Sequence, residues 1–178
     1  RGQQISRPKE DILNEVKMLI KNGCKEVTLI GQNVNAYGID FKDKKYLFKD
    51  LLEDVAKLKV KRIRFSTSNP WNFDRKIVDV IKKYPNIMPN IHLPIQSGDN
   101  NILRAMNRKM DIKDYIELVQ YMKDNIKDLS VTTDLIVAFP NEDKKAFENT
   151  LKLYNTIKFD NAYTFIFSPR EGTPAANI

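Results

Sequence analysis

Apolar residues recur along the chain with two different periods, and these periods alternate from one end of the sequence to the other. Stretches with apolar residues three or four positions apart predict helices, and short runs of β-branched and aromatic residues predict strands. The predicted helices cover residues 8–21, 48–58, 77–84, 112–122 and 147–157, with a short extra helix over 100–106. The predicted strands cover residues 26–31, 62–67, 90–95, 130–139 and 161–168. Five such alternations indicate a parallel sheet whose strands are joined by crossover helices.

The series begins with a helix rather than a strand. Ser6 is expected to cap this helix, Pro8 suits its first turn, and Asn22 and Gly23 end it. We therefore expect the first strand of the sheet to lie upstream of Arg1. The opening without Met and the abrupt ending lead us to expect that residues 1–178 are one domain of a longer protein.

The predicted strands have one apolar and one polar face. The residues expected beneath the helices are Val27, Leu29, Ile63, Phe65, Ile91, Leu93, Ile95, Leu135, Val137, Tyr163, Phe165 and Phe167. Those expected on the other face are Thr28, Gln32, Arg64, Ser66, His92, Gln96, Thr132, Asp134, Thr164 and Ser168. A doubly wound sheet is apolar on both faces, and a complete (β/α)₈ barrel fills its interior with branched apolar side chains. The polar face therefore predicts a partial α/β barrel with a ligand-binding lumen.

Composition narrows the function only slightly. The formal charge of +7 favours a polyanionic partner such as RNA, although lysine enrichment has other causes. No apolar run is long enough to span a membrane, and no signal peptide is evident. The single cysteine, Cys24, excludes an internal disulfide and a multi-cysteine metal site within this sequence, and it fits a reducing cytoplasm.

All five predicted strands end in polar loops, which read "GQNVN", "STSNP", "HLPIQSGD", "AFPNED" and "SPREGTPA". Ligands of parallel α/β proteins bind at the carboxyl ends of the strands, so these loops predict a binding site. The sequence contains no Ser/His/Asp set, no nucleophile elbow and no phosphate-binding glycine loop of the usual spacing. The expected ligand is therefore a cofactor that carries its own chemistry.

Individual side chains in these loops allow two interpretations each. Gln32, Asn33 and Asn35 either bind a ligand or satisfy loop backbone, and His92 is either a ligand contact or a structural histidine. Asp134 either pairs with Arg64 or contacts a substrate. Tyr37 and Trp71 either stack on a base or pack. Arg108 and Arg170 are either surface charges or anchors for carboxylate and phosphate groups.

Over nearly the whole chain, the sequence resembles the core of the radical-SAM methylthiotransferases. The motifs that carry this resemblance are "LIGQNVNAYG", "RIRFSTSNP", "HLPIQSGDNNILRAMNR", "TDLIVAFPNE" and "FIFSPREGTPAA". These motifs are most similar to those of the branch that modifies isopentenyl-adenosine beside the tRNA anticodon. The resemblance implies a partial (β/α)₆ barrel that lacks its first strand here, with the C-x₃-C-x₂-C loop of that strand. It also implies an N-terminal domain with a second [4Fe–4S] cluster and a C-terminal RNA-binding β-barrel, both outside residues 1–178.

The resemblance assigns roles to the residues of the strand ends. Gly31, Gln32 and Asn33 would hold the methionine amine of S-adenosylmethionine, Arg108 its carboxylate, Phe139 its adenine, and Gln96 and Ser97 its ribose or carboxylate. Ser66 would also face this cofactor. Tyr37, His92, Asp134 and Arg170 would be left for the substrate adenosine and its phosphates. The sequence departs from the family pattern at Asn69 for His, at Asp99 for Ser, and at Ala138 and Asn141 for glycines.

The activity implied is insertion of a methylthio group at C2 of the adenine by radical chemistry. The partners implied are a tRNA anticodon stem-loop and a flavodoxin or ferredoxin as electron donor, for a monomeric cytoplasmic enzyme without membrane contact. Residues 1–178 alone would ligate no cluster and would be inactive. The alternatives are a methylthiotransferase for a ribosomal protein or for threonylcarbamoyl-adenosine in tRNA, and a non-redox α/β barrel that binds a nucleotide or RNA.

Overall fold

The computed structural model describes residues 3–177, and it confirms the predicted alternation of helices and strands. The strands are β1 (Glu26–Leu29), β2 (Arg62–Phe65), β3 (Asn90–His92), β4 (Ser130–Val137) and β5 (Asn161–Ile166). The helices are α1 (Lys9–Lys21), α2 (Phe48–Lys57), α3 (Lys76–Lys83), α4 (Asn100–Ala105), α5 (Ile112–Asn125) and α6 (Lys144–Ile157). No helix among residues 3–177 is long and apolar enough to cross a membrane.

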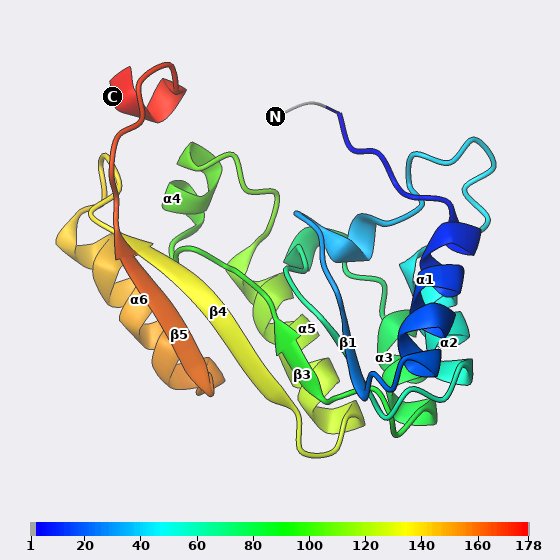
Figure 1. Cartoon of the computed structure of the whole chain (residues 1–178). Helices are drawn as coiled ribbons and strands as arrows, with labels where there is room; N and C mark the ends of the chain where they lie inside the picture. The colour runs from blue at the N-terminus through cyan, green and yellow to red at the C-terminus, as the bar shows by residue number, and fades with distance from the viewer. Residues whose placement is uncertain (1–2, 178) are drawn as a thin grey trace.

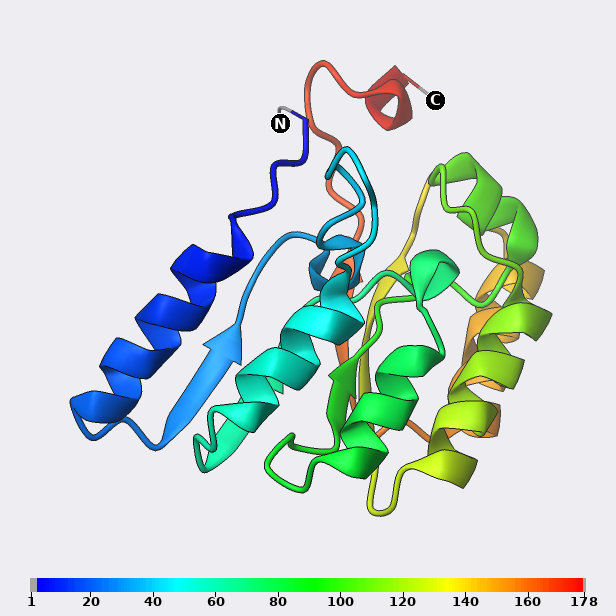
Figure 2. The ribbon, with the colours of Figure 1, turned by 90° about the vertical axis from the view of Figure 1, so that its right-hand side faces the viewer.

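All three strand pairs are parallel and form two short sheets, β1–β2 and β3–β4–β5. The two sheets meet where Ile63 bridges to Ile87 and where the Ser68 N–H donates to the His92 carbonyl at 3.2 Å. In Figure 1 the strands β3, β4 and β5 face the viewer and α5 and α6 lie behind them. Seen from the side, β1 projects between α1 and α2 (Figure 2), and Figure 1 shows both helices on the same side of this strand. The result is the partial barrel that the sequence predicts.

One apolar core holds the helices against the outer face of the strands. Most of the expected strand residues are buried there, and Ile63, Ile91 and Leu93 have no exposed surface. Tyr115 of α5 is also fully buried, and its hydroxyl donates to the Leu93 carbonyl at 2.8 Å. Burial raises the pKa of Tyr115, so this hydroxyl remains a hydrogen-bond donor at all ordinary pH values.

The prediction for β5 is wrong for Tyr163 and Phe165, which are exposed, whereas Phe167 packs on a small apolar cluster that includes Ala146 of α6. Tyr163 lies beside Asp134 of β4, and Ala162 rather than Tyr163 packs on the core. The register follows from Asp160, whose N–H donates to the Val131 carbonyl and whose carboxylate accepts from the Val131 N–H. Since neighbouring residues of a strand point to opposite faces, this register turns Tyr163 and Phe165 towards the polar face.

The prediction that Ser6 caps α1 is also wrong. Pro8 occupies the capping position and makes no side-chain cap. The Ser6 hydroxyl donates to Asp40 at 2.6 Å and accepts from the Gly38 N–H at 3.0 Å. Ser6 therefore ties the segment before α1 to the loop after β1 instead of starting the helix.

The loop after β3 approaches α6 very closely. A Cβ atom built at Gly98 would lie 2.5 Å from the Thr150 Cα and 2.6 Å from the Asn149 carbonyl oxygen. The Gly98 N–H donates to the Thr150 hydroxyl at 2.9 Å. The next residue, Asp99, caps α4 by accepting from the Asn101 and Ile102 N–H groups.

Gly98→Ala is expected to lower the free energy of unfolding by about 1–3 kcal/mol, because the added methyl group meets the backbone of α6. Gly31→Ala is the matched control, since its methyl group would meet only the Val34 Cγ2 atom at 3.6 Å. The control should change stability by about 0.5 kcal/mol or less. Urea unfolding of the 178-residue chain, followed by circular dichroism, measures both values. Equal stabilities of the two variants would contradict the close approach.

Ionisation of Asp99 should make the free energy of unfolding depend on pH. Burial opposes its ionisation, but hydrogen bonds from the Asn149 side chain and from the Ile102 and Asn101 N–H groups lower its pKa below the ordinary value. A lowered folded-state pKa contributes stability above the unfolded pKa of about 3.9, and this stability is lost as the pH falls through the folded value. We expect Asp99→Asn, which can still cap α4, to lose less free energy of unfolding between about pH 5 and about pH 2 than the unchanged chain. A parallel loss in both proteins, measured by urea unfolding, would refute this role.

Candidate functional site

The loops that follow the strands gather at one end of the barrel. They carry the short helix α4 and the 3₁₀ turns Val34–Ala36, Pro70–Asn72 and Pro174–Asn177. Figure 1 shows this end at the top, together with both ends of the described chain. The polar loops that the sequence singled out therefore do surround one region of the molecule.

Of the carboxamide side chains after β1, that of Asn35 is buried and stabilises the loops, whereas that of Gln32 is exposed. Asn35 is buried, its side-chain oxygen accepts from the Asn69 N–H at 2.7 Å, and its amide nitrogen donates to the Asn69 carbonyl at 3.0 Å. Asn33 accepts from the same Asn69 N–H at 3.4 Å. Asn35 thus clamps the loop after β2, as the backbone interpretation predicts, whereas Gly31 and Gln32 lie exposed at the tip of the loop.

Three neighbouring strand ends contain a residue in the left-handed backbone region. These are Thr67 with φ 63°, Gln96 with φ 76° and Ala138 with φ 58°. Side chains other than glycine rarely adopt this conformation, and strain of this kind concentrates at binding and active sites. Ala138 is held by the Glu142 carboxylate, which accepts from its N–H. The backbone keeps a glycine-like conformation at Ala138, and at Asn141 with φ 64°.

A polar cluster occupies the open face of the sheet. The His92 Nδ1 atom lies 3.0 Å from the Thr132 hydroxyl, and its Nε2 atom lies 3.5 Å from the Asp134 carboxylate. The side chains of His92 and Asp134 are 21% and 27% exposed. Both are therefore held by partners while part of each remains accessible to a ligand.

Arg64 does not pair with Asp134, so that interpretation is wrong. The Arg64 Nε atom lies 3.2 Å from the Glu26 carboxylate, and the Arg62 Nε atom lies 2.6 Å from it. The hydrogen bond from Arg62 lowers the pKa of Glu26, with the charges of Arg64 and Arg62 adding to the effect. The parallel register, which sets Thr28 beside Arg64, brings these charges together at the start of β1 and β2.

Arg108 lies half-buried beyond the strand ends. Its guanidinium carbon is 5.4 Å from the centre of the Trp71 ring, which is a cation–π distance. Burial lowers the pKa of Arg108 while the charge of Asp134 raises it. An arginine keeps its proton under such a shift, so Arg108 brings a fixed positive charge to the region of Asp134.

Tyr37 packs against neighbouring side chains and donates a hydrogen bond to the backbone. The Tyr37 hydroxyl donates to the Arg7 carbonyl at 2.8 Å, and its ring packs edge-on against Phe41 and Tyr46. Burial is the main cause that raises the pKa of Tyr37, to about 12. These contacts favour the packing interpretation of Tyr37 over base stacking.

Ser97 and Phe139 lie beneath the surface of the loops. Ser97 is fully buried, and its hydroxyl accepts from the Asp99 N–H at 3.2 Å. The Phe139 ring is buried against Phe167, with 4.9 Å between the ring centres. Both residues therefore shape the loops from below.

The remaining predicted residues differ in exposure. Ser66 is half-buried, and its N–H donates to the Leu29 carbonyl at the top of β1 and β2. Gln96 is buried, while Arg170 is exposed in the segment after β5. The tertiary structure thus brings His92, Asp134 and Arg108 towards one another, and it places Arg170 in an exposed segment.

A groove of about 840 Å³ runs between β1 and the segment that contains α1. Its walls include Thr28, Gly31, Gln32 and Asn33 together with apolar residues of α1. β1 pairs with β2 along one edge, and this groove lies along the other side.

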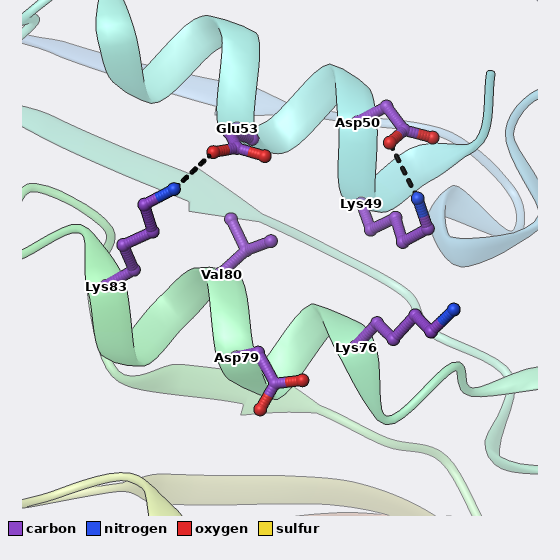
Figure 3. Close-up of a pocket in the computed structure, with 7 residues that line it drawn as sticks. All are labelled: Lys49, Asp50, Glu53, Lys76, Asp79, Val80 and Lys83. Carbon is purple, nitrogen blue, oxygen red and sulfur yellow. Dashed lines mark hydrogen bonds and ion pairs between the residues drawn. The ribbon is translucent and has the colours of Figure 1, made fainter.

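A second hollow, of about 330 Å³, lies on the outside of the barrel between α2 and α3 (Figure 3). Lys83 reaches Glu53 at 2.8 Å and Lys49 reaches Asp50 at 2.6 Å. The hydrogen bond from Lys83 is the main cause that lowers the pKa of Glu53, to about 2. Most charged side chains that line this hollow are paired with one another. The hollow also faces away from the strand ends, so it is not a candidate site.

Among residues 3–177, no group of three or more His, Cys, Asp or Glu side chains is placed to hold a metal ion. The Cys24 thiol lies 2.9 Å from the Glu26 carbonyl at the far end of β1. An iron–sulfur cluster does not fit the ligands of this part of the chain.

Asn35→Ala should lower the free energy of unfolding by about 1–3 kcal/mol, because it removes two short hydrogen bonds and leaves the Asn69 N–H and carbonyl with one long contact each, at 3.4 Å. Asn33→Ala is the matched control, since it removes only one long contact and should cost less than about 1 kcal/mol. Urea unfolding of both variants tests the difference. A smaller loss for Asn35→Ala than for Asn33→Ala would show that the clamp is misassigned.

Comparisons with known proteins agree with this architecture. The chain is 65% identical over its whole length to the tRNA-2-methylthio-N(6)-dimethylallyladenosine synthase of Malacoplasma penetrans, and 51% identical to that of Bacillus subtilis. It spans 36% and 35% of these two relatives, about a third of their length.

Two solved structures share the fold at low sequence identity. Coproporphyrinogen III oxidase of Escherichia coli aligns with 98% of this chain and 42% of its own, at 15% identity and a TM-score of 0.66. Methylornithine synthase aligns with 99% of this chain and 49% of its own, at 16% identity and a TM-score of 0.65. The family description that matches residues 1–154 is that of the radical SAM superfamily, and the chain therefore belongs to this superfamily.

Proposed function

We propose that this chain is the S-adenosylmethionine-binding core of a tRNA methylthiotransferase that acts at C2 of isopentenyl-adenosine beside the anticodon. The observation that carries the proposal is the identity of 65% to a tRNA-2-methylthio-N(6)-dimethylallyladenosine synthase along the entire chain. Because the chain spans about a third of that relative, the complete reaction belongs to a longer protein.

The residues present fit S-adenosylmethionine by their chemistry. Arg108 offers a half-buried cation, which suits the methionine carboxylate. Gln32 and Asn33, at the top of the groove beside β1, offer carboxamide oxygens for the amine. The left-handed turns at Gln96 and Ala138 bring backbone groups to the same end of the barrel. When bound beside a reduced iron–sulfur cluster, S-adenosylmethionine supplies radical chemistry.

The contribution of this chain is then to bind, to orient and to exclude water. Gly31, Gln32, Asn33, Ser66, Gln96 and Arg108 are proposed to hold the cofactor, with Ser97 and Phe139 supporting its loops from below. His92 and Asp134 are proposed to contact the substrate nucleoside, and Arg170 its phosphates. The sequence contains no conventional set of acid–base residues, which is consistent with a protein that binds and orients while the cofactor supplies the chemistry.

The remaining parts are proposed for the longer protein. They comprise the cysteine ligands of two [4Fe–4S] clusters, an N-terminal domain and an RNA-binding β-barrel. A positive charge of +7 on this chain favours contact with tRNA. A flavodoxin or ferredoxin is proposed as electron donor to a monomeric, cytoplasmic enzyme.

The test uses the full-length protein, purified without air and incubated with S-adenosylmethionine, a reductant and tRNA that carries isopentenyl-adenosine. Mass spectrometry of the digested tRNA should show a methylthio gain on that nucleoside. Arg108→Ala should weaken S-adenosylmethionine binding about tenfold or more, because a charge-assisted hydrogen bond is lost. Arg75→Ala is the matched control, since Arg75 also stacks on an aromatic ring, that of Tyr121, but lies at the start of α3.

Two results would contradict the proposal. The first is formation of 5′-deoxyadenosine with no change in any tRNA nucleoside, which would move the substrate elsewhere. The second is equal affinity of the Arg108→Ala and Arg75→Ala proteins for S-adenosylmethionine, which would remove Arg108 from the cofactor site.

A further inference from the structure

Two aromatic side chains lie exposed on the open face of the sheet. Tyr163 and Phe165 of β5 are 52% and 54% exposed. They are two residues apart on one strand, so both rings stand on the same face. Their partners in β4 are Asp134 and Ile136, so the aromatic pair lies next to the polar cluster.

Contact with this cluster fixes the position of Tyr163. The rings of Tyr163 and His92 meet edge to face, with 6.0 Å between their centres and 71° between their planes. His92 is itself held by Thr132 and Asp134. A continuous row therefore runs from an aromatic surface to a histidine and a carboxylate, all on one side of the sheet.

Large aromatic rings ordinarily gain stability by burial, whereas these two neighbouring rings together form an exposed aromatic patch beside hydrogen-bonding groups. The described core contains Phe159, two residues before β5, but it excludes Tyr163 and Phe165. Aromatic rings beside hydrogen-bonding groups are the means by which proteins bind unstacked bases. Stacking holds the face of a base, and the polar groups read its edge.

We propose that Tyr163 and Phe165 form the stacking surface for the target base, with Asp134 and His92 at its edge. The inference rests on the proposed function, from which the base is an adenine with a substituted amine. A carboxylate such as that of Asp134 accepts a hydrogen bond from the remaining N–H of that amine. The stacking surface is thus a substrate-positioning element on the open face of the sheet, built from β5 and not from the strand-end loops.

The experiment measures binding of an isopentenylated anticodon stem-loop RNA to the full-length protein with intact clusters. Tyr163→Leu and Phe165→Leu should each weaken RNA binding about tenfold, because a base–aromatic contact is lost. Tyr163→Phe keeps the ring and should bind within about twofold of the unchanged protein. Tyr154→Leu is the matched control, since Tyr154 is an exposed tyrosine on α6 and should leave RNA binding unchanged.

Two further readouts separate stacking from a general structural effect. The Leu variants should raise the KM for RNA more than they lower kcat, and their thermal unfolding should match that of Tyr154→Leu. Their affinity for S-adenosylmethionine, and their release of 5′-deoxyadenosine without RNA, should be unchanged. This pattern would support the assignment of the rings to the substrate base.

Unchanged RNA binding by both Leu variants would overturn the inference. Weakened S-adenosylmethionine binding with normal RNA binding would also overturn it, since the rings would then serve the adenine of the cofactor. Failure of the proposed function is distinguishable, because it appears in the unchanged protein as RNA without a methylthio group.

Discussion

Parallel pairing is the constraint on which the rest of this structure depends. Each strand must be followed by a crossover, and right-handed crossovers place successive helices on one side of the sheet. Residues from α1, α2, α3, α5 and α6 accordingly share one core with the outer faces of the strands. The opposite face receives no helix from the described chain, which leaves His92, Asp134 and Tyr163 partly accessible. The accessible polar face therefore exists because the connections of the described chain use one side of the sheet.

The strand-end loops are rigid for reasons that differ from loop to loop. Asn35 clamps the loop after β2 through both atoms of its carboxamide. Gly98 lets the loop after β3 touch the backbone of α6. The Glu142 carboxylate holds the strained turn at Ala138. Together these contacts fix backbone groups at the mouth of the barrel, which is what a binding site for a reactive cofactor requires.

Charge and aromatic surface are separated within the barrel. Glu26, Arg62 and Arg64 neutralise one another at the amino ends of β1 and β2. Arg108 stacks on Trp71 beyond the carboxyl ends, and the exposed rings of Tyr163 and Phe165 lie on β5, next to β4 at the edge of the sheet. This arrangement suits one ligand with a carboxylate at the strand ends and a second ligand with a flat apolar face.

The sequence alone determined the order and type of the elements, because apolar periodicity and turn residues are local signals. It also showed that all five strand ends are polar, and from this it predicted where a ligand would bind. Three matters were decided only by the tertiary structure. Asn35 and Arg64 found partners more than thirty residues away, which no local pattern specifies. The face of β5 was set by Asp160 pairing with Val131, not by the alternation within the strand. Local periodicity shows that a strand has two faces, but hydrogen bonds with a distant partner decide which face meets the core.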